Sequence, residues 1–310
     1  MDKFRSVPSS FVFASEAARA MRLGLPLVAL ETAVVTHGLP RPHNLLLAQS
    51  LERIVRENGA VPATIGLLDG KVHIGLEPEE LSRLANTDGA RKISRRDFGI
   101  ALAREELGGT TVAGTLIAAR LAGIRVFATG GIGGVHRNAP FDISADLPEL
   151  GRSPLVVVCA GAKSILDLPA TVEVLETNGV PIIGYQTAEF PAFYSRQSGL
   201  PVNVQVDSPS EAARIAQAHW NMGLESAVLV VQPPPAEAAL PAEQVEEALR
   251  RALAEAEEQK ISGAAVTPFL LDRVGSLSGG ASLTANLALL ENNARLAAQI
   301  AAALQPRQVI

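Results

Sequence analysis

Residues 155–169 read LVVVCAGAKSILDLP, and this stretch runs without a break from an apolar segment through a glycine to a lysine. Five consecutive apolar residues rich in valine are typical of a parallel strand that is buried on both faces. Gly161 allows a tight turn out of the sheet, so Lys163 is predicted just beyond the carboxyl end of the strand. Open α/β sheets bind their ligands at that edge.

Lys163 is therefore a candidate catalytic residue. Ser164 is a candidate N-cap, which would direct the free N–H groups of a helix into the same crevice. A positive charge is disfavoured at a helix N-terminus, and a partly neutral amine is a nucleophile towards carbonyls. The alternative is a loop lysine that extends to solvent or binds a phosphate.

The composition fits a large α/β domain. The chain has 310 residues, of which 47% are hydrophobic, so it can bury a substantial core. Helical and strand-like segments alternate without repeats or low-complexity linkers, which predicts one three-layer α/β/α domain over residues 1–310 with a mixed, mostly parallel sheet. Asp69-Gly70 between two apolar runs predicts a hairpin that supplies antiparallel strands. Residues 1–10 are expected to be poorly ordered.

Charge and cysteine content exclude several classes of protein. The net charge is −5 with both signs interspersed, which argues against polymeric nucleic acid as a partner. The single cysteine, Cys159, lies inside the apolar strand, so no intramolecular disulfide can form and a reducing compartment fits. No run reaches the roughly 18 apolar residues of a membrane span, and residues 1–10 lack the apolar region of a signal peptide. We expect a cytoplasmic protein that makes no use of a membrane.

Glu31 directly follows a second apolar segment, residues 26–30. A carboxylate at a strand's carboxyl end, followed by Thr32 and His37, is a candidate general acid or base. The alternative is an exposed glutamate at the end of a strand.

Two segments are candidates for binding an anion. Residues 92–97 (KISRRD) carry three cations within five positions, although such a run is also typical of a solvated loop. Residues 129–136 (TGGIGGVH) are rich in glycine, which lets backbone N–H groups converge on a phosphate. This run matches no nucleotide-binding fingerprint, and a tight turn is an equal alternative.

Two further segments carry polar or aromatic groups. Asp142 and Asp146 are four residues apart and suit a hard cation or a sugar hydroxyl, whereas the alternative is a helix cap and an exposed carboxylate. The cysteine and histidine ligands of a structural zinc site are absent. Residues 190–196 (FPAFYSR) are either a lid that stacks on a flat base or a packing element.

Several segments together carry a resemblance to a known family. From about residue 12 to residue 303 the chain closely resembles the pseudouridine-5′-phosphate glycosidase family, which includes the indigoidine-synthase-A-like proteins. The segments that carry the resemblance are residues 29–32 (ALET), 36–42 (THGLPRP), 60–65 (AVPATI), 92–97 (KISRRD), 128–137 (ATGGIGGVHR), 141–147 (FDISADL), 159–167 (CAGAKSILD) and Asn286.

The resemblance implies an enzyme that reversibly cleaves the C–C glycosidic bond of pseudouridine 5′-phosphate, giving uracil and ribose 5-phosphate. Carbon is a poor leaving group, so the usual route with two carboxylates would be unfavourable. By the resemblance, Lys163 is the nucleophile that forms a Schiff base on the ring-opened ribose, and Glu31 moves protons on and off the base.

The resemblance also implies one Mn²⁺ per subunit, held by Asp142 and mostly by water, and a homotrimer. The residues that it assigns to the substrate are Lys92, the backbone of Val112, Ser144, Ala145, Asp146 and Asn286, with Thr129 and His136 as neighbours of the phosphate or ribose.

Two other functions remain open from the sequence. A Schiff-base lyase or aldolase on another sugar phosphate would also use Lys163, but would not require a pyrimidine. A non-catalytic nucleotide-binding module would need no reactive lysine at all.

Overall fold

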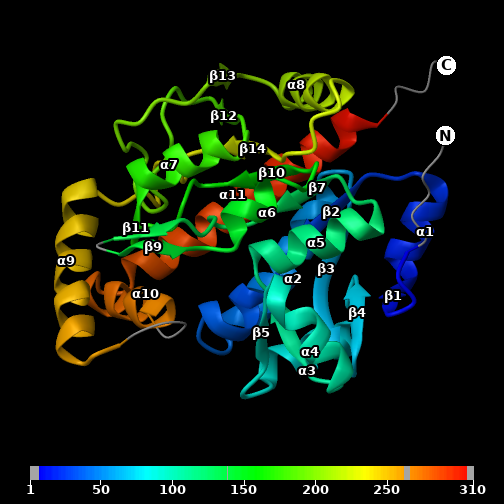
Figure 1. The fold of residues 1–310 in the computed structure, drawn as a ribbon, viewed down its shortest axis with the longest axis horizontal. Coiled ribbons are helices and arrows are strands. Elements are labelled where there is room, and N and C mark those ends of the chain that lie inside the picture. The colour runs from blue at the N-terminus through cyan, green and yellow to red at the C-terminus, as the bar shows by residue number, and fades with distance from the viewer. Residues whose placement is uncertain (1–6, 138, 262–265, 306–310) are drawn as a thin grey trace.

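The computed structural model describes residues 7–137, 139–261 and 266–305. A large mixed sheet forms the centre, with the strand order β1-β4-β3-β2-β7-β10-β14-β12-β13, and with β6 and β5 branching from β3 (Figure 1). The strands are β1 (Phe11–Phe13), β2 (Leu27–Leu30), β3 (Val61–Leu68), β4 (Lys71–Ile74), β5 (Arg91–Ile93), β6 (Gly108–Thr110), β7 (Val126–Ala128), β10 (Val156–Cys159), β12 (Ile182–Tyr185), β13 (Val204–Val206) and β14 (Val228–Val231).

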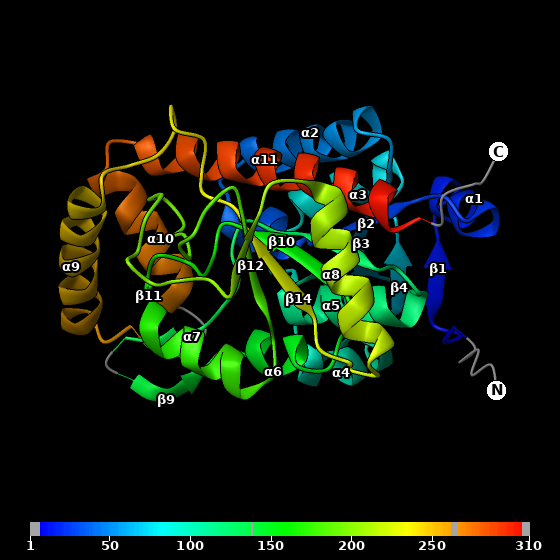
Figure 2. The same ribbon diagram turned by 90° about the horizontal axis from the view of Figure 1, so that it is seen from above.

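Helices cover both faces of this sheet, as predicted for a three-layer α/β/α fold (Figure 2). Helices α2 and α11 lie along one face and α5, α6 and α7 along the other. The helices are α1 (Ser15–Leu23), α2 (His43–Glu57), α3 (Pro78–Asn86), α4 (Phe98–Ala103), α5 (Val112–Ala122), α6 (Asp146–Leu150), α7 (Leu168–Thr177), α8 (Pro209–Asn221), α9 (Ala242–Glu258), α10 (Val266–Leu277) and α11 (Ala281–Leu304), with a π-turn η1 (Val34–Gly38) and a 3₁₀ turn η2 (Arg95–Asp97).

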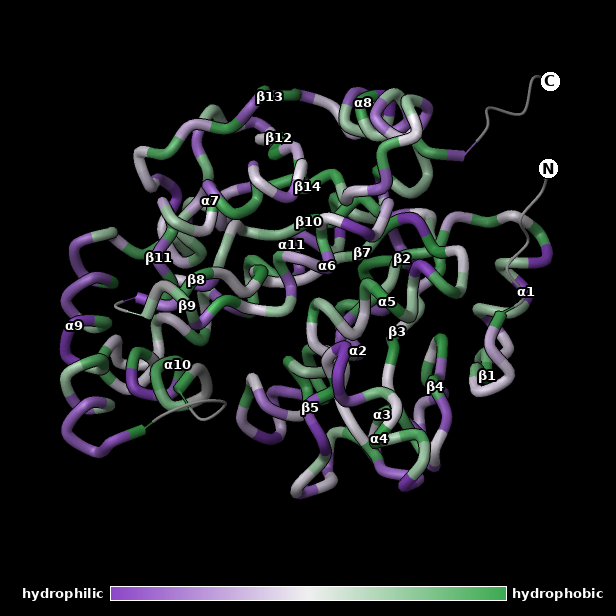
Figure 3. Tube along the Cα trace, in the orientation of Figure 1, coloured by the Kyte–Doolittle hydropathy of each residue, from purple (hydrophilic) through white to green (hydrophobic). Residues whose placement is uncertain are grey.

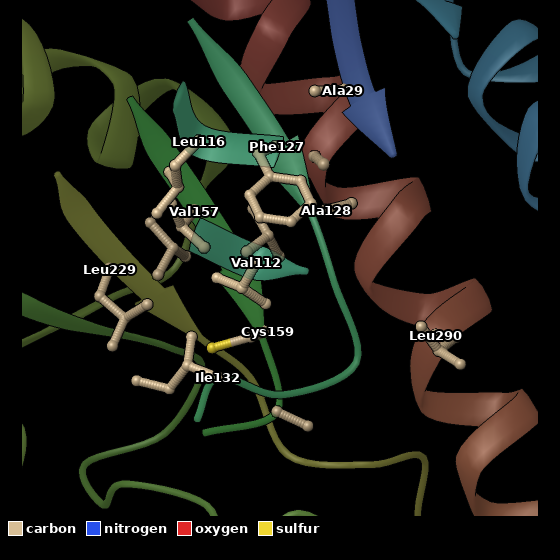
Figure 4. Close-up of a cluster of buried hydrophobic side chains, with 14 of the residues drawn as sticks. Ala29, Val112, Leu116, Phe127, Ala128, Ile132, Val157, Cys159, Leu229 and Leu290 are labelled. Carbon is tan, nitrogen blue, oxygen red and sulfur yellow. The ribbon is translucent and has the colours of Figure 1, made fainter. Parts of the chain in front are cut away.

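The predicted strand in the opening stretch is β10, at the centre of the sheet. It pairs in parallel with β7 on one side and β14 on the other. The register places Phe127, Val157 and Leu229 side by side in one row, and Val112 and Leu116 of α5 lie against that row (Figure 4). All five side chains are buried, so the valine-rich run is explained by burial on both faces of the strand.

The predicted hairpin at Asp69-Gly70 is confirmed, because it joins the antiparallel strands β3 and β4. Both residues have positive φ, 49° and 73°, which a tight two-residue hairpin turn requires. Of the segment expected to be poorly ordered, residues 1–6 lie outside the described residues, and β1 follows at Phe11.

The prediction that Ser164 caps a helix is wrong. Helix α7 begins at Leu168, and its N-cap is Asp167, whose side chain accepts a hydrogen bond from the Ala170 N–H at 3.0 Å. No helix begins directly after β10, because the backbone there is bonded elsewhere: Lys163 N–H donates to Ile132 O at 3.0 Å, and Lys163 O accepts from Leu166 N–H in a turn. Residues Leu166–Asp167 then join a small antiparallel sheet as β11, beside β8 (Val135–His136) and β9 (Ala139–Ile143).

Hydrophobic residues gather in the central strands, whereas hydrophilic residues dominate α9 at the end of the molecule (Figure 3). One continuous core includes Val28 near the start of the chain and Ala301 in α11. No helix among the described residues combines the length and the apolar character that crossing a membrane would need.

Candidate active site

A cavity of about 190 Å³ lies beyond the carboxyl ends of β2, β7 and β10. It is the edge of the sheet that the sequence predicted for a ligand. Of the predicted site residues, those that line it are Glu31, Lys92, Val112, His136, Ser144, Ala145, Asp146, Lys163 and Asn286. Two others, Thr129 and Asp142, are not part of its wall.

Glu31 directly follows β2 and is half-buried in the cavity wall. Burial raises the pKa of its carboxyl group, against the lowering effects of the Lys163 charge and of a hydrogen bond that the Thr129 hydroxyl donates to Oε1. The charge of Asp146 raises it further, and that of Lys92 lowers it. A carboxyl group that keeps its proton at a higher pH than usual is suited to act as a general acid.

Lys163 is half-buried and reaches the cavity from the turn that follows β10. The turn depends on Gly161, which has φ 83° and lies so close to Pro191 that a Cβ atom would stand 2.2 Å from its carbonyl oxygen. A residue with a side chain would be strained there and would displace Lys163. Lys163 is thus positioned by this turn and by the bond of its N–H to Ile132 O rather than by a helix N-terminus.

Only part of the basic run 92–97 reaches the cavity, at Lys92 and Ser94. Arg95 instead pairs with the buried Glu149 at 2.7 Å, and Arg96 is exposed. Burial lowers the pKa of the Lys92 amine, and the neighbouring charge of Lys163 lowers it further. The charges of Asp146 and Glu31 act in the opposite direction and raise this pKa. Two lysines in one cavity can donate charge-assisted hydrogen bonds to an anionic ligand.

Asp146 ties two walls of the cavity together. Its Oδ1 accepts a hydrogen bond from Ala113 N–H and its Oδ2 from Gly133 N–H, both at 2.8 Å. The carboxylate is only 5% exposed, so the alternative of an exposed surface carboxylate is wrong. It fixes the start of α5 against the glycine run.

The glycine run permits close packing around the cavity. A Cβ atom on Gly133 would stand 2.2 Å from Ser144 Oγ, and one on Gly131 would stand 2.6 Å from the ring of Phe193. Phe190, Phe193 and Tyr194 are buried, so the aromatic segment has the predicted packing role. Phe193 also lines the cavity and has a positive φ of 62°.

The sequence did not single out several other residues of the wall. The residues that complete it include Ala33, Val34, Gly38, Ser94, Thr111, Ile165, Leu271 and Leu290. His37 lies there as well, and burial together with the charge of Lys92 lowers its pKa, so that it is neutral near pH 7.

Thr129 and Asp142 lie outside the wall. Thr129 is buried and its hydroxyl is directed at Glu31. Asp142 lies exposed on β9. Among the described residues no three His, Cys, Asp or Glu side chains form a group that could hold a metal ion. The residues at Asp142 thus fit a cation that takes most of its ligands from water, as Mg²⁺ commonly does.

Comparisons with known proteins agree on one family. Residues 16–303 match the family model described as indigoidine synthase A like protein. The chain is 54% identical over 298 residues to a pseudouridine-5′-phosphate glycosidase of Herpetosiphon aurantiacus, covering 96% of this chain and 98% of the relative. It is 52% identical over 292 residues to one of Geobacillus kaustophilus, covering 94% and 97%.

Two solved structures share the fold over nearly the whole chain. The crystal structure of the prealnumycin C-glycosynthase AlnA in complex with ribulose 5-phosphate has a TM-score of 0.89 and 42% identity, covering 96% of this chain and 97% of that one. An indigoidine synthase A-like protein of Thermotoga maritima has a TM-score of 0.87 and 38% identity, covering 97% and 99%.

Proposed function

Because the chain belongs to the indigoidine synthase A like family, we propose that it is a pseudouridine-5′-phosphate glycosidase. The observation that carries the proposal is one cavity that brings a lysine and a glutamate with a raised pKa together, next to a second lysine. The names of the curated relatives, at about half identity over nearly the full length, support the substrate.

The chemistry needs a nucleophile that can compensate for a poor leaving group. We propose that the neutral amine of Lys163 attacks C1′ of the ribose. The ring oxygen leaves and takes one proton from the attacking nitrogen, which gives a hydroxyl and restores the nitrogen lone pair. When the bond from C1′ to the base carbon breaks, its electron pair goes to the base, and the nitrogen lone pair forms a C=N bond to C1′. Glu31 supplies the proton to the base carbon, which releases uracil. Water then hydrolyses the iminium to ribose 5-phosphate and restores the lysine.

Lys92 is proposed to bind the phosphate. It lies beside Ser94 and the start of α5 in the cavity wall, and the N–H groups at a helix start favour an anion. The Ala113 N–H already donates to Asp146, and the Gly114 N–H donates to the Thr111 hydroxyl. The Val112 N–H is therefore proposed as the donor that faces the substrate. His136, Ser144, Ala145 and Asn286 are proposed to contact the rest of the nucleotide.

A divalent cation such as Mn²⁺ is proposed at Asp142, with water completing its ligands. When bound, such a cation would supply positive charge beside Asp142. We also propose a cytoplasmic homotrimer. Phe141 and Ile143 of β9 are 97% and 43% exposed, and together they support a role for this edge in association.

The deciding experiment measures uracil release from pseudouridine 5′-phosphate by chromatography. We expect turnover by the wild-type protein and none by Lys163→Ala. A lyase or aldolase of another sugar phosphate would release no uracil but would still be trapped by borohydride with its own substrate. A nucleotide-binding module would bind pseudouridine 5′-phosphate without turnover and without a trapped adduct.

A further inference from the structure

A buried polar network lies beneath the cavity, on the side of α11. Asn293 of α11 donates from Nδ2 to Thr129 O at 2.8 Å, with Gly130 O at 3.4 Å from the same nitrogen. Its Oδ1 accepts a hydrogen bond from Gln232 Nε2 at 3.0 Å, and Gln232 follows the end of β14. Asn293 and Thr129 are each 1% exposed, and Gln232 is 5% exposed.

The network fixes Thr129 from both ends of its backbone. Its N–H donates to Val158 O of β10 at 3.0 Å, and its carbonyl is held by Asn293. The Thr129 hydroxyl donates to Glu31 Oε1, so this one residue connects the buried network to the carboxyl group. Burying an amide costs free energy unless its hydrogen bonds are made, so packing alone does not explain Asn293 at this position.

We infer that Asn293 is a positioning residue for the proton transfer by Glu31. By clamping the Thr129 carbonyl it aims the Thr129 hydroxyl at one carboxyl oxygen of Glu31, which leaves the other oxygen free for the substrate. This inference rests on the proposed function, because it assumes that Glu31 transfers the proton. Neither Asn293 nor Thr129 lines the cavity, so both act through Glu31.

A double-mutant cycle tests this coupling. We expect Thr129→Val and Asn293→Ala each to lower kcat for uracil release about tenfold, the size expected for the loss of one hydrogen bond, with little change in KM. Because both changes break the same chain of contacts, the double variant should be about as slow as either single variant. Independent effects would multiply to about a hundredfold loss.

The pH profile gives a second readout that a purely structural role would not move. The Thr129 hydrogen bond lowers the pKa of Glu31, whereas the other charged groups around it, Lys163, Asp146 and Lys92, stay unchanged in these variants. A general acid loses its proton as pH rises, so kcat falls above its pKa. Both single variants should therefore shift the alkaline limb of kcat to higher pH.

Controls separate this inference from misfolding and from the proposed function. Asn178 does not line the cavity, and its side chain donates a 2.7 Å hydrogen bond to Val174 O. Asn178→Ala should therefore leave kcat unchanged. All variants should still be trapped on Lys163 by ribose 5-phosphate and borohydride. If Asn293→Ala does not fold, Asn293→Ser replaces it, since serine is uncharged and its side chain is too short to reach the Thr129 carbonyl.

The possible outcomes are distinct. The inference would be overturned if the two losses in kcat multiplied in the double variant, or if the alkaline limb of kcat did not shift. Uracil release by the wild-type protein would still support the proposed function. A wild-type protein that releases no uracil would overturn both.

Discussion

Replacing Asp146 by asparagine tests whether this residue holds the cavity together. The carboxylate accepts hydrogen bonds from two backbone N–H groups, of Ala113 and Gly133, both at 2.8 Å. Asparagine has the same shape but only one acceptor oxygen, so its NH₂ group must face one of the two donors. One buried N–H then loses its partner and meets a second donor.

The expected loss of stability follows from these contacts. Leaving a buried donor unsatisfied costs about 1–3 kcal/mol, and the remaining hydrogen bond loses its charge assistance. The negative charge at the start of α5 is lost as well, worth about 0.3–1 kcal/mol. We expect Asp146→Asn to lower the free energy of unfolding by about 2–4 kcal/mol, a large share of the roughly 5–15 kcal/mol typical of a folded domain.

Urea unfolding followed by circular dichroism measures this loss, at one fixed protein concentration in case subunits associate. Asp207→Asn is the matched control, because Asp207 is exposed and makes only a 3.3 Å contact with Gln205. The control should change the free energy of unfolding by no more than about 0.5 kcal/mol. If Asp146→Asn were as stable as this control and only KM rose, Asp146 would be a substrate contact rather than a tie between walls.

Three further outcomes are expected. Lys163→Ala should abolish both turnover and borohydride capture of ribose 5-phosphate. Glu31→Gln should still capture ribose 5-phosphate but release uracil about 10²–10⁴-fold more slowly. Intact-protein mass spectrometry detects the adduct, and an adduct in Lys163→Ala would contradict the role of Lys163 as the nucleophile. Chelation should abolish uracil release and Mn²⁺ should restore it, with full activity after exhaustive chelation counting against a metal at Asp142. Pseudouridine without its phosphate should react far more slowly than pseudouridine 5′-phosphate, and Lys92→Gln should reduce the ratio of the two rates. Equal rates for both substrates in the wild-type protein would show that Lys92 holds no phosphate.

The sequence located the central residues because each lies at or just beyond the end of an apolar run. A strand buried on both faces has a recognisable end, so Glu31 after β2 and Lys163 after β10 were placed at the same edge of the sheet. The hairpin was predictable for a similar local reason, since Asp69 and Gly70 both adopt positive φ.

Features that depend on distant contacts were not predictable. Ser164 looked like an N-cap, but bonds between its segment and the glycine run delay the helix to Leu168. The clamp of Asn293 on Thr129 joins residues 164 positions apart, and an asparagine inside an apolar helix gives no sign of its partner. Only the packing of α11 on the sheet brings the two together.

The position of α11 has a consequence for biosynthesis. Its residues 281–304 pack against β2, β7 and β10, which are made long before it. At about 5–20 residues per second, on the order of tens of seconds pass between synthesis of β2 and of α11. During that time the part of this sheet face that α11 covers is exposed on the ribosome. Stalled chains lacking residues 281–304 should accordingly be cut rapidly by protease, and chains that include them should resist.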